Sequence, residues 1–280
     1  MQGKVVVITG GTSGIGQVSA EKLAAMGARI VLVARSKSRG EATLAKLQEL
    51  APKESHSVHY GDVSRLNDLN RLAAEIRSAE PRIDVLINNA GAAFGERQVT
   101  EDGLELTFAT NHMSYFVLTH GLQDGLLAAG AARVINTSSH AHYRAKIDFD
   151  DLQMQNNFGG FKAYGCSKLC NILYTRALMR RLEGTGITAN SLHPGFVKTR
   201  IGEEGKGLGA AVFRFMKHFA ITPEKGAETI VYLASSGDVA KTTGLYFYKC
   251  KPVEPSKLAQ DDAAAERLWQ ETAKLAGIKE

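Results

Sequence analysis

The stretch KVVVITGGTSGIG (Lys4–Gly16) is a short β-branched run that leads directly into a cluster of glycines. Such a run favours a buried strand, and the amphipathic stretch Gln17–Met26 that follows favours a helix. Gly27 stands where a left-handed helix cap belongs, and Arg29–Ala34 is the next strand-like run. Residues 4–34 therefore predict one β-α-β unit, whose crossover makes its two strands parallel.

The same alternation continues along the chain. We therefore expect a single Rossmann-type domain over residues 1–280, with one doubly wound parallel α/β sheet of about seven strands and helices on both faces. Further strands are expected at His56–Tyr60, Ile83–Ile87, Arg133–Thr137, Thr188–Leu192 and Gly244–Tyr248. Helices are expected at Ser38–Leu50, Arg65–Ala79, Gly103–Ala129, from Tyr164, after an N-cap at Thr222 with Pro223 in the first turn, and at Asp261–Ala276.

Two segments interrupt this alternation. Residues 140–163 are polar and irregular, and residues 202–221 combine several glycines with the apolar and basic stretch Ala210–Ile221. Each follows the carboxyl end of an expected strand, the side on which open α/β sheets bind ligands. We expect a substrate-loop insertion at 140–163 and a lid at 202–221 that closes over an apolar substrate. A membrane-surface helix and a plain core helix are the alternatives for Ala210–Ile221.

The composition favours a protein of a reducing compartment. The chain has 280 residues, 44% of them hydrophobic, and a net charge of +5 that is spread along its length. The sequence does not alternate basic and aromatic residues as a groove for single-stranded nucleic acid does, so nucleic-acid binding is not expected. Cys166, Cys170 and Cys250 have no disulfide-framework spacing, and no signal peptide or run of 18 apolar residues is present. We expect a cytoplasmic protein without a transmembrane segment.

The glycine turn predicts a site for a dinucleotide. Its spacing is Gly10-x-x-x-Gly14-x-Gly16, placed between a strand and a helix. Glycines allow a tight turn and let a pyrophosphate approach the helix N-terminus, where free N–H groups and the helix dipole favour anions. The residues expected to contact the cofactor here are Gly10, Thr12, Ser13, Gly14, Ile15 and Gly16.

The residue after the second strand indicates which dinucleotide binds. An acidic residue there accepts hydrogen bonds from the ribose 2′-hydroxyl of NAD(H). This chain has Arg35 at that position, with Lys37 and Arg39 nearby. An arginine suits a 2′-phosphate, so we expect NADP(H) rather than NAD(H). The alternative is that all three are ordinary solvated charges.

Further polar and small residues follow the later strands. Asn88-Asn89-Ala90-Gly91 would let a cofactor lie against the backbone, although the same residues could form a simple turn. Ser138 and Ser139 close the fifth strand, where a hydroxyl could bind a carbonyl oxygen. His193–Thr199 would place a rigid turn and a hydroxyl at the same edge of the sheet.

Tyr164 and Lys168 are four residues apart, and a helix places them on one face. A phenol titrates near pH 10, so it exchanges protons with an alcohol at neutral pH only when a nearby cation favours its ionised form. Lys168 could supply that cation. Taken alone, the spacing is also explained by a tyrosine that packs and a lysine that solvates.

Together these motifs resemble the short-chain dehydrogenase/reductases. The matching segments follow one another in the family's order over nearly the whole chain: TGGTSGIG (Thr9–Gly16), NNAG (Asn88–Gly91), the serine before Tyr164-x-x-x-Lys168, and PGFVKT (Pro194–Thr199). The resemblance implies a catalytic set of Asn111, Ser139, Tyr164 and Lys168. It also implies cofactor contacts from Asp62, Val63, Asn88, Ala90, Gly91, Tyr164, Lys168, Pro194, Gly195, Val197 and Thr199.

The resemblance also implies roles for these residues. Tyr164 would transfer a proton to or from the substrate oxygen, and Ser139 would stabilise that oxygen. Lys168 would bind the nicotinamide ribose and lower the tyrosine pKa, and Asn111 would hold a water that relays protons. Asp62 with Val63 would contact adenine, and Thr199 the nicotinamide amide.

The separation of 25 positions from Ser139 to Tyr164 narrows the resemblance further. The extra segment HAHYRAKIDFDDLQ is similar to the insertion of retinol dehydrogenases, protochlorophyllide reductase and the WW-domain oxidoreductases, as are KCKPVEPS and ERLWQET near the end. His140 and His142 flank the insertion, and with no third ligand in view we expect them to line the pocket mouth rather than bind a metal.

The sequence thus predicts an NADP(H)-dependent oxidoreductase that interconverts an alcohol and a carbonyl on an apolar small molecule, retinoid-, steroid- or lipid-aldehyde-like. A catalytically weak NADP(H)-binding regulatory protein of the same fold is the alternative. Sugar-nucleotide epimerase or dehydratase chemistry is disfavoured by the glycine spacing. The resemblance also allows a homodimer or homotetramer.

Overall fold

The computed structural model describes residues 1–196 and 221–279. Its strands are β1 (Val5–Thr9), β2 (Arg29–Ala34), β3 (Ser57–Tyr60), β4 (Val85–Asn88), β5 (Arg133–Thr137), β6 (Thr188–Leu192), β7 (Tyr246–Tyr248) and β8 (Lys251–Pro252). Its α-helices are α1 (Gly14–Ala25), α2 (Lys37–Leu50), α3 (Leu66–Ala79), α4 (Leu106–Phe108), α5 (Ser114–Gly121), α6 (Gln123–Ala128), α7 (Gly160–Arg181), α9 (Pro223–Ser235) and α10 (Asp262–Ala276).

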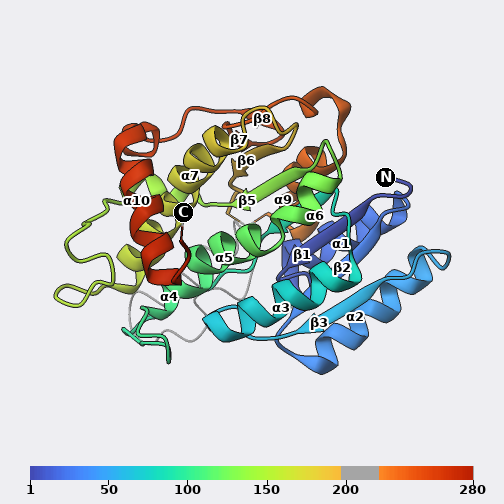
Figure 1. Cartoon of the computed structure of the whole chain (residues 1–280), viewed down its shortest axis with the longest axis horizontal. Coiled ribbons are helices and arrows are strands. Elements are labelled where there is room, and N and C mark those ends of the chain that lie inside the picture. The colour runs from blue at the N-terminus through green and yellow to red at the C-terminus, as the bar shows by residue number, and fades with distance from the viewer. Residues whose placement is uncertain (197–220, 280) are drawn as a thin grey trace.

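The strands form one sheet in the order β3-β2-β1-β4-β5-β6-β7-β8, and every pair is parallel except β7 with β8 (Figure 1). The expected doubly wound α/β fold is therefore confirmed. The expected number of strands was one too low, because β8 was missed. Lys249 and Cys250 both take positive φ angles in a two-residue hairpin turn, and neither residue type signals such a turn.

Helices cover both faces of the sheet (Figure 1). Alternate residues of each strand point to opposite faces, so Val6 and Ile8 enter the core shared with α1, α2 and α9. Val7 and Val33 enter the core beneath α3, α5 and α7. Helix α10 packs on the outer side of α7. No helix of the described residues is both long and apolar enough to cross a membrane.

The expected continuous helix over Gly103–Ala129 is broken into pieces. Helix α4 begins at Leu106, a π-helical turn follows over Ala109–Met113, and α5 and α6 complete the segment. The carboxylate of Glu105 accepts hydrogen bonds from the backbone N–H groups of Thr107 and Phe108, which fixes the start of α4. The π-helical turn contains Asn111, so the break lies at a candidate site residue.

The chain order of the strands locates the ligand-binding edge. After β1 the chain adds β2 and β3 on one side, and then crosses β1 to add β4 and the later strands on the other. Open α/β sheets bind ligands beyond the carboxyl ends of their strands at this kind of reversal. The glycine turn after β1 and the Asn89–Gly91 segment after β4 both lie there.

Candidate active site

The glycine turn leaves the helix N-terminus of α1 open for an anion. A Cβ on Gly16 would lie 2.2 Å from the Gly10 carbonyl oxygen and 2.5 Å from Asn89 Nδ2, so only glycine allows this close packing. Ser13 is the extended N-cap residue of α1, and the first turn of this helix contains no acidic side chain. These features fit a bound pyrophosphate, whose charge the helix N-terminus favours.

Replacing Gly16 by alanine is therefore expected to lower both the thermal stability and the affinity for the dinucleotide. Overpacking of this kind costs about 1 to 3 kcal/mol. Gly95→Ala is the matched control, because a Cβ there would meet no atom within 4 Å. Thermal unfolding and cofactor-fluorescence titration measure the two effects. Equal behaviour of the two variants would show that the turn tolerates a side chain.

Arg35 and Asp62 meet at the outer part of the same edge. Arg35 follows β2, its side chain is 72% exposed, and its Nη1 lies 3.7 Å from Asp62 Oδ2. The other carboxylate oxygen of Asp62 accepts hydrogen bonds from the backbone N–H and the hydroxyl of Ser64, at 3.0 and 2.8 Å. Val63, between Asp62 and Ser64 in the sequence, packs against the core as a partly buried side chain. The exposed guanidinium is thus free to face a ligand that reaches this edge.

The residues at the end of β4 and directly after it have different hydrogen-bond partners. The Asn88 side chain is buried and donates to Thr119 Oγ1 at 3.0 Å and to Asn136 Oδ1 at 2.9 Å, so it points into the core rather than toward a cofactor. Ala90 accepts a hydrogen bond from the Tyr115 hydroxyl through its carbonyl. The side-chain oxygens of Asn88 and Asn89 have no hydrogen-bond partner among the described residues.

Ser139, Tyr164, Lys168 and Asn111 come together from three different elements. Ser139 follows β5, Tyr164 and Lys168 lie in the first turns of α7, and Asn111 comes from the π-helical turn. Ser139 lies close enough to Tyr164 to act on its pKa, and Lys168 Nζ lies 5.7 Å from the centre of the Tyr164 ring. A Cβ on Gly91 would lie 3.1 Å from Lys168 Nζ and 3.3 Å from Asn111 Oδ1.

The two adjacent serines have different environments. Ser138 is buried and donates its hydroxyl hydrogen to the Lys168 backbone carbonyl at 2.6 Å, so it supports α7. Ser139 keeps part of its surface exposed beside Tyr164, and its hydroxyl also accepts from the Ala141 N–H at 3.2 Å. Of the two serines, only Ser139 is partly exposed at this site.

Burial dominates the electrostatics of this site. It lowers the pKa of Lys168 to about 7, and Lys168 is 2% exposed. Burial also raises the pKa of Tyr164, while the hydrogen bond with Ser139 acts in the lowering direction. The net direction for Tyr164 is therefore upward in the cofactor-free protein, and a lysine with a pKa near 7 is only partly charged at neutral pH.

The Asn111 side chain is fully engaged within the protein. Its Oδ1 accepts from the Ala92 N–H at 2.7 Å, and its Nδ2 donates to the Ala92 carbonyl at 2.8 Å and to Ser167 Oγ at 2.9 Å. Ser167 in turn donates to the Tyr164 carbonyl at 2.8 Å. Asn111 thus joins the segment after β4 to the first turns of α7.

The residues expected after β6 are only partly described. Pro194 and Gly195 lie at the same edge of the sheet, and the Gly195 N–H donates to His193 Nδ1 at 3.2 Å. Val197, Thr199 and all but the last residue of the expected lid at 202–221 lie outside the described residues.

Comparisons with known proteins agree with this geometry. The family model described as short chain dehydrogenase matches residues 4–206. The chain belongs to this family. Human retinol dehydrogenase 13 is 38% identical over 284 residues, covering 99% of this chain and 86% of the relative. Mouse retinol dehydrogenase 12 is 38% identical over 277 residues, covering 99% and 87%.

Solved structures show the same fold. A protein of Mycobacterium paratuberculosis with no stated function superposes with a TM-score of 0.81 at 29% identity, covering 99% of this chain and 95% of that one. A variant of the actinorhodin polyketide ketoreductase, crystallised with NADPH, has a TM-score of 0.68 at 26% identity and covers 87% and 94%. The retinol dehydrogenase-like subgroup expected from the insertion is thus confirmed by the curated relatives.

As a short-chain dehydrogenase, the chain is an oxidoreductase that acts on CH–OH groups with a nicotinamide dinucleotide. The turn after β1, the backbone after β4 and the polar cluster around Tyr164 fit this cofactor, because they offer an anion site, a surface without side chains and a proton donor along one edge. No three histidine, cysteine or acidic side chains of the described residues gather as a metal site would require.

The insertion of this dehydrogenase is anchored to its core by His142. The expectation that both histidines line the pocket mouth is wrong for His142, which is fully buried. Its Nδ1 lies 2.7 Å from the Ser139 carbonyl, and its Nε2 accepts from the Ser256 N–H at 3.1 Å. His140 is exposed and follows Ser139 directly. Two neighbouring histidines could not be told apart by sequence, because the partner Ser256 is more than a hundred residues away.

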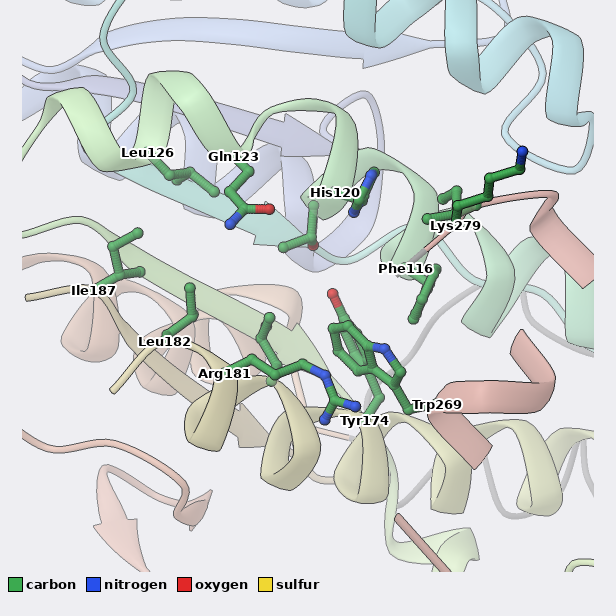
Figure 2. A pocket seen from close by; sticks show the side chains of 13 residues that line it. Phe116, His120, Gln123, Leu126, Tyr174, Arg181, Leu182, Ile187, Trp269 and Lys279 are labelled. Atoms are coloured by element: carbon green, nitrogen blue, oxygen red, sulfur yellow. The ribbon is translucent and has the colours of Figure 1, made fainter. Parts of the chain in front are cut away.

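A separate cavity of about 250 Å³ lies between α5, α6, α7 and α10. Figure 2 shows the aromatic rings of Phe116, Tyr174 and Trp269 on one side of it. The Arg181 guanidinium lies 4.0 Å from the centre of the Trp269 ring and also pairs with Glu266. None of the expected cofactor or catalytic residues lines this cavity, so it is not part of the candidate active site.

Sequence reasoning missed two buried residues next to Lys168. The Tyr115 ring centre lies 5.6 Å from Lys168 Nζ, and Asn171 hydrogen-bonds the backbone on either side of the site. Asn171 had a signal: it is the polar residue in the apolar run Leu169–Leu173, three positions after Lys168 and therefore on the same helix face. Tyr115 had none, because its neighbours are ordinary core residues.

Proposed function

We propose that this short-chain dehydrogenase uses NADP(H) to interconvert an alcohol and a carbonyl on an apolar small molecule of retinoid-like, steroid-like or lipid-aldehyde-like character. One observation carries the proposal. The Tyr164 ring lies 5.7 Å from Lys168 Nζ and next to Ser139, at the edge of the sheet where the glycine turn leaves the N-terminus of α1 open. Proton transfer and dinucleotide binding thus meet at one place.

In the proposed mechanism, Tyr164 is the general acid and base. It donates its phenolic proton to the carbonyl oxygen during reduction and takes the proton back during oxidation. Ser139 holds the same substrate oxygen through its hydroxyl, and Lys168 in its charged form favours the ionised tyrosine. Asn111 fixes the backbone on which Lys168 packs. The nicotinamide, when bound, supplies or accepts the hydride.

The preference for NADP(H) rests on Arg35. Its exposed guanidinium stands where an acidic residue would bind the ribose hydroxyls of NAD(H), and it offers a planar set of donors to a 2′-phosphate. Its contact with Asp62 at 3.7 Å is loose and solvated, so a phosphate can displace it.

Arg35→Asp is expected to lower the ratio of kcat/KM for NADPH to kcat/KM for NADH by at least about tenfold, because a charge-assisted pair with the phosphate is replaced by repulsion. Arg77→Asp, in the last turn of α3, makes the same change of charge as a control. Steady-state kinetics with both cofactors measure the ratio. An unchanged ratio in the Arg35 variant would mean that another group binds the 2′-phosphate of NADP(H).

The apolar substrate class is supported by a wall of rings next to Ser139. The His193 ring stacks on Tyr248 at 4.1 Å with an interplanar angle of 13°, and His140 lies 5.7 Å from His193. Burial lowers the pKa of His193 to about 4, so its ring is neutral at pH 7. A site beside these neutral rings suits an uncharged molecule, and the curated relatives are named for retinol.

The direct test is NADPH oxidation with a panel of aldehydes and ketones, among them retinal, steroid ketones and medium-chain lipid aldehydes. Turnover that is fastest with apolar carbonyls supports the proposal. Tight NADPH binding without turnover across the panel would instead favour a regulatory protein of the same fold.

We further propose a cytoplasmic location and a homodimer or homotetramer. The described cysteines are all free thiols, with Cys166 and Cys170 buried, which suits a reducing compartment. Size-exclusion chromatography with light scattering measures the number of copies in the assembly.

A further inference from the structure

One buried side chain connects two backbone carbonyls next to Lys168. Asn171 lies on α7 and is 0% exposed. Its Nδ2 donates to the carbonyl oxygen of Asn111 at 2.9 Å and to that of Thr137 at 3.2 Å. Carbonyl oxygens only accept, so these two partners fix the orientation of the amide. The NH₂ group faces the site and the amide oxygen faces away from it.

The Thr137 carbonyl is also the acceptor for Lys168. Lys168 Nζ donates to it at 3.1 Å, and the Tyr115 hydroxyl lies 3.4 Å from the same oxygen. Among the described residues, no carboxylate forms an ion pair with Lys168. The position of this one oxygen therefore determines where the ammonium group rests, and Asn171 donates to the same oxygen.

The Asn111 carbonyl belongs to the π-helical turn, in which the ordinary hydrogen-bond pattern of a helix is altered. Asn171 supplies a donor to it from the neighbouring helix. The amide oxygen of the same Asn171 side chain lies 3.3 Å from His112 Nδ1. Burial lowers the pKa of His112 to about 4, so this ring is neutral at pH 7 and places no charge near Lys168.

We propose that Asn171 is a positioning residue of the active site: its single amide group holds the Asn111 backbone and the Thr137 carbonyl at the spacing that aims Lys168 at Tyr164. This inference rests on the proposed function, in which Tyr164 and Lys168 carry the proton transfer. Asn171 itself touches neither substrate nor cofactor. Its effect passes through the two carbonyls.

Asn171→Ala is expected to lower kcat by about tenfold or more, because small displacements of a catalytic group are costly. The KM for NADPH should change less than kcat. The pH profile of kcat should show an inflection where Lys168 titrates, and this inflection should move to higher pH. Without the competing Asn171 donor, the Thr137 carbonyl is a better acceptor for the ammonium form of Lys168. The described titratable groups that face Lys168 are Tyr115 and Tyr164.

Asn190→Ala is the matched control. Asn190 is another buried asparagine that bonds two backbone groups, donating to the Thr242 carbonyl at 2.6 Å and accepting from the Leu245 N–H at 3.1 Å, on β6. The Asn190→Ala variant should be less stable than the wild type, with little change in the pH at which kcat inflects. If Asn171→Ala does not fold, Asn171→Asp keeps the shape and removes the donor, and its carboxylate should move the inflection higher still.

The outcomes separate cleanly. A folded Asn171 variant with wild-type kcat and an unmoved inflection would overturn the positioning role, as would a loss of kcat that matches the Asn190 control without a shift in pH. A wild-type protein that binds NADPH but turns over no carbonyl would defeat the proposed function instead, and the inference with it.

Discussion

Tyr164→Phe is expected to lower turnover by about 10²- to 10⁴-fold, the range of general acid–base catalysis, while NADPH binding remains nearly intact. The substitution removes one hydroxyl and keeps the ring. The hydroxyl is the group that contacts Ser139, whereas the ring packs beside Lys168. Single-turnover reduction and NADPH fluorescence titration separate the two effects.

Tyr232→Phe, on α9 at the other face of the sheet, is the control for loss of a phenolic oxygen. It should retain wild-type turnover. Robust turnover by the Tyr164 variant would mean that another group delivers the proton, and the mechanism proposed for this site would be abandoned.

Lys168→Met is expected to abolish most turnover, weaken cofactor binding and yet make the cofactor-free protein more stable. Lys168 is buried, and its hydrogen bond to Thr137 does not offset the loss of hydration, so its pKa falls from 10.5 to about 7. One pKa unit corresponds to about 1.4 kcal/mol. At low pH the charged lysine therefore costs on the order of 5 kcal/mol, which methionine avoids.

The sign of the pH dependence follows from the direction of this shift. The native state binds fewer protons at Lys168 than the unfolded state between pH 7 and 10.5, so the penalty is complete below pH 7 and fades as the pH rises. The stability advantage of the methionine variant should shrink by about 2 kcal/mol from pH 7 to pH 9. Tyr115 and Tyr164 stay protonated in both states over this range, because tyrosine titrates near pH 10 even when unfolded.

Urea unfolding of the cofactor-free wild type and variant across this range measures the difference. Equal stabilities at pH 7 would show that water or a rearranged neighbour solvates the ammonium group. The difference in free energy of unfolding would also show how much stability the protein loses by keeping a lysine buried at this site.

The sequence was sufficient for the architecture and for the edge that carries the site. Strands Arg133–Thr137 and Thr188–Leu192 have the bounds expected from their β-branched patterns, and Thr222 caps α9 as its N-cap residue with Pro223 in the first turn. Local propensity and tertiary packing agree at these positions. The glycine spacing, likewise, reflects a local backbone requirement that one segment of chain can reveal.

Features that depend on distant partners could not be found in this way. The hairpin turn at Lys249–Cys250 and the π-helical turn around Asn111 have no local signal, because packing against other elements imposes them. His142 is structural only because Ser256 donates to it. The direction of the Tyr164 pKa also depends on burial, which a spacing of two residues in the sequence does not contain.

The short strand β8 has a consequence for assembly. It is the last strand of the sheet, and it consists of a charged lysine and a proline that lacks a backbone N–H group. Such an edge is a poor template for pairing with another chain. Two copies of this protein would therefore not extend one another's sheet across β8, and an assembly through that side would have to form through side chains rather than a shared ladder of backbone hydrogen bonds.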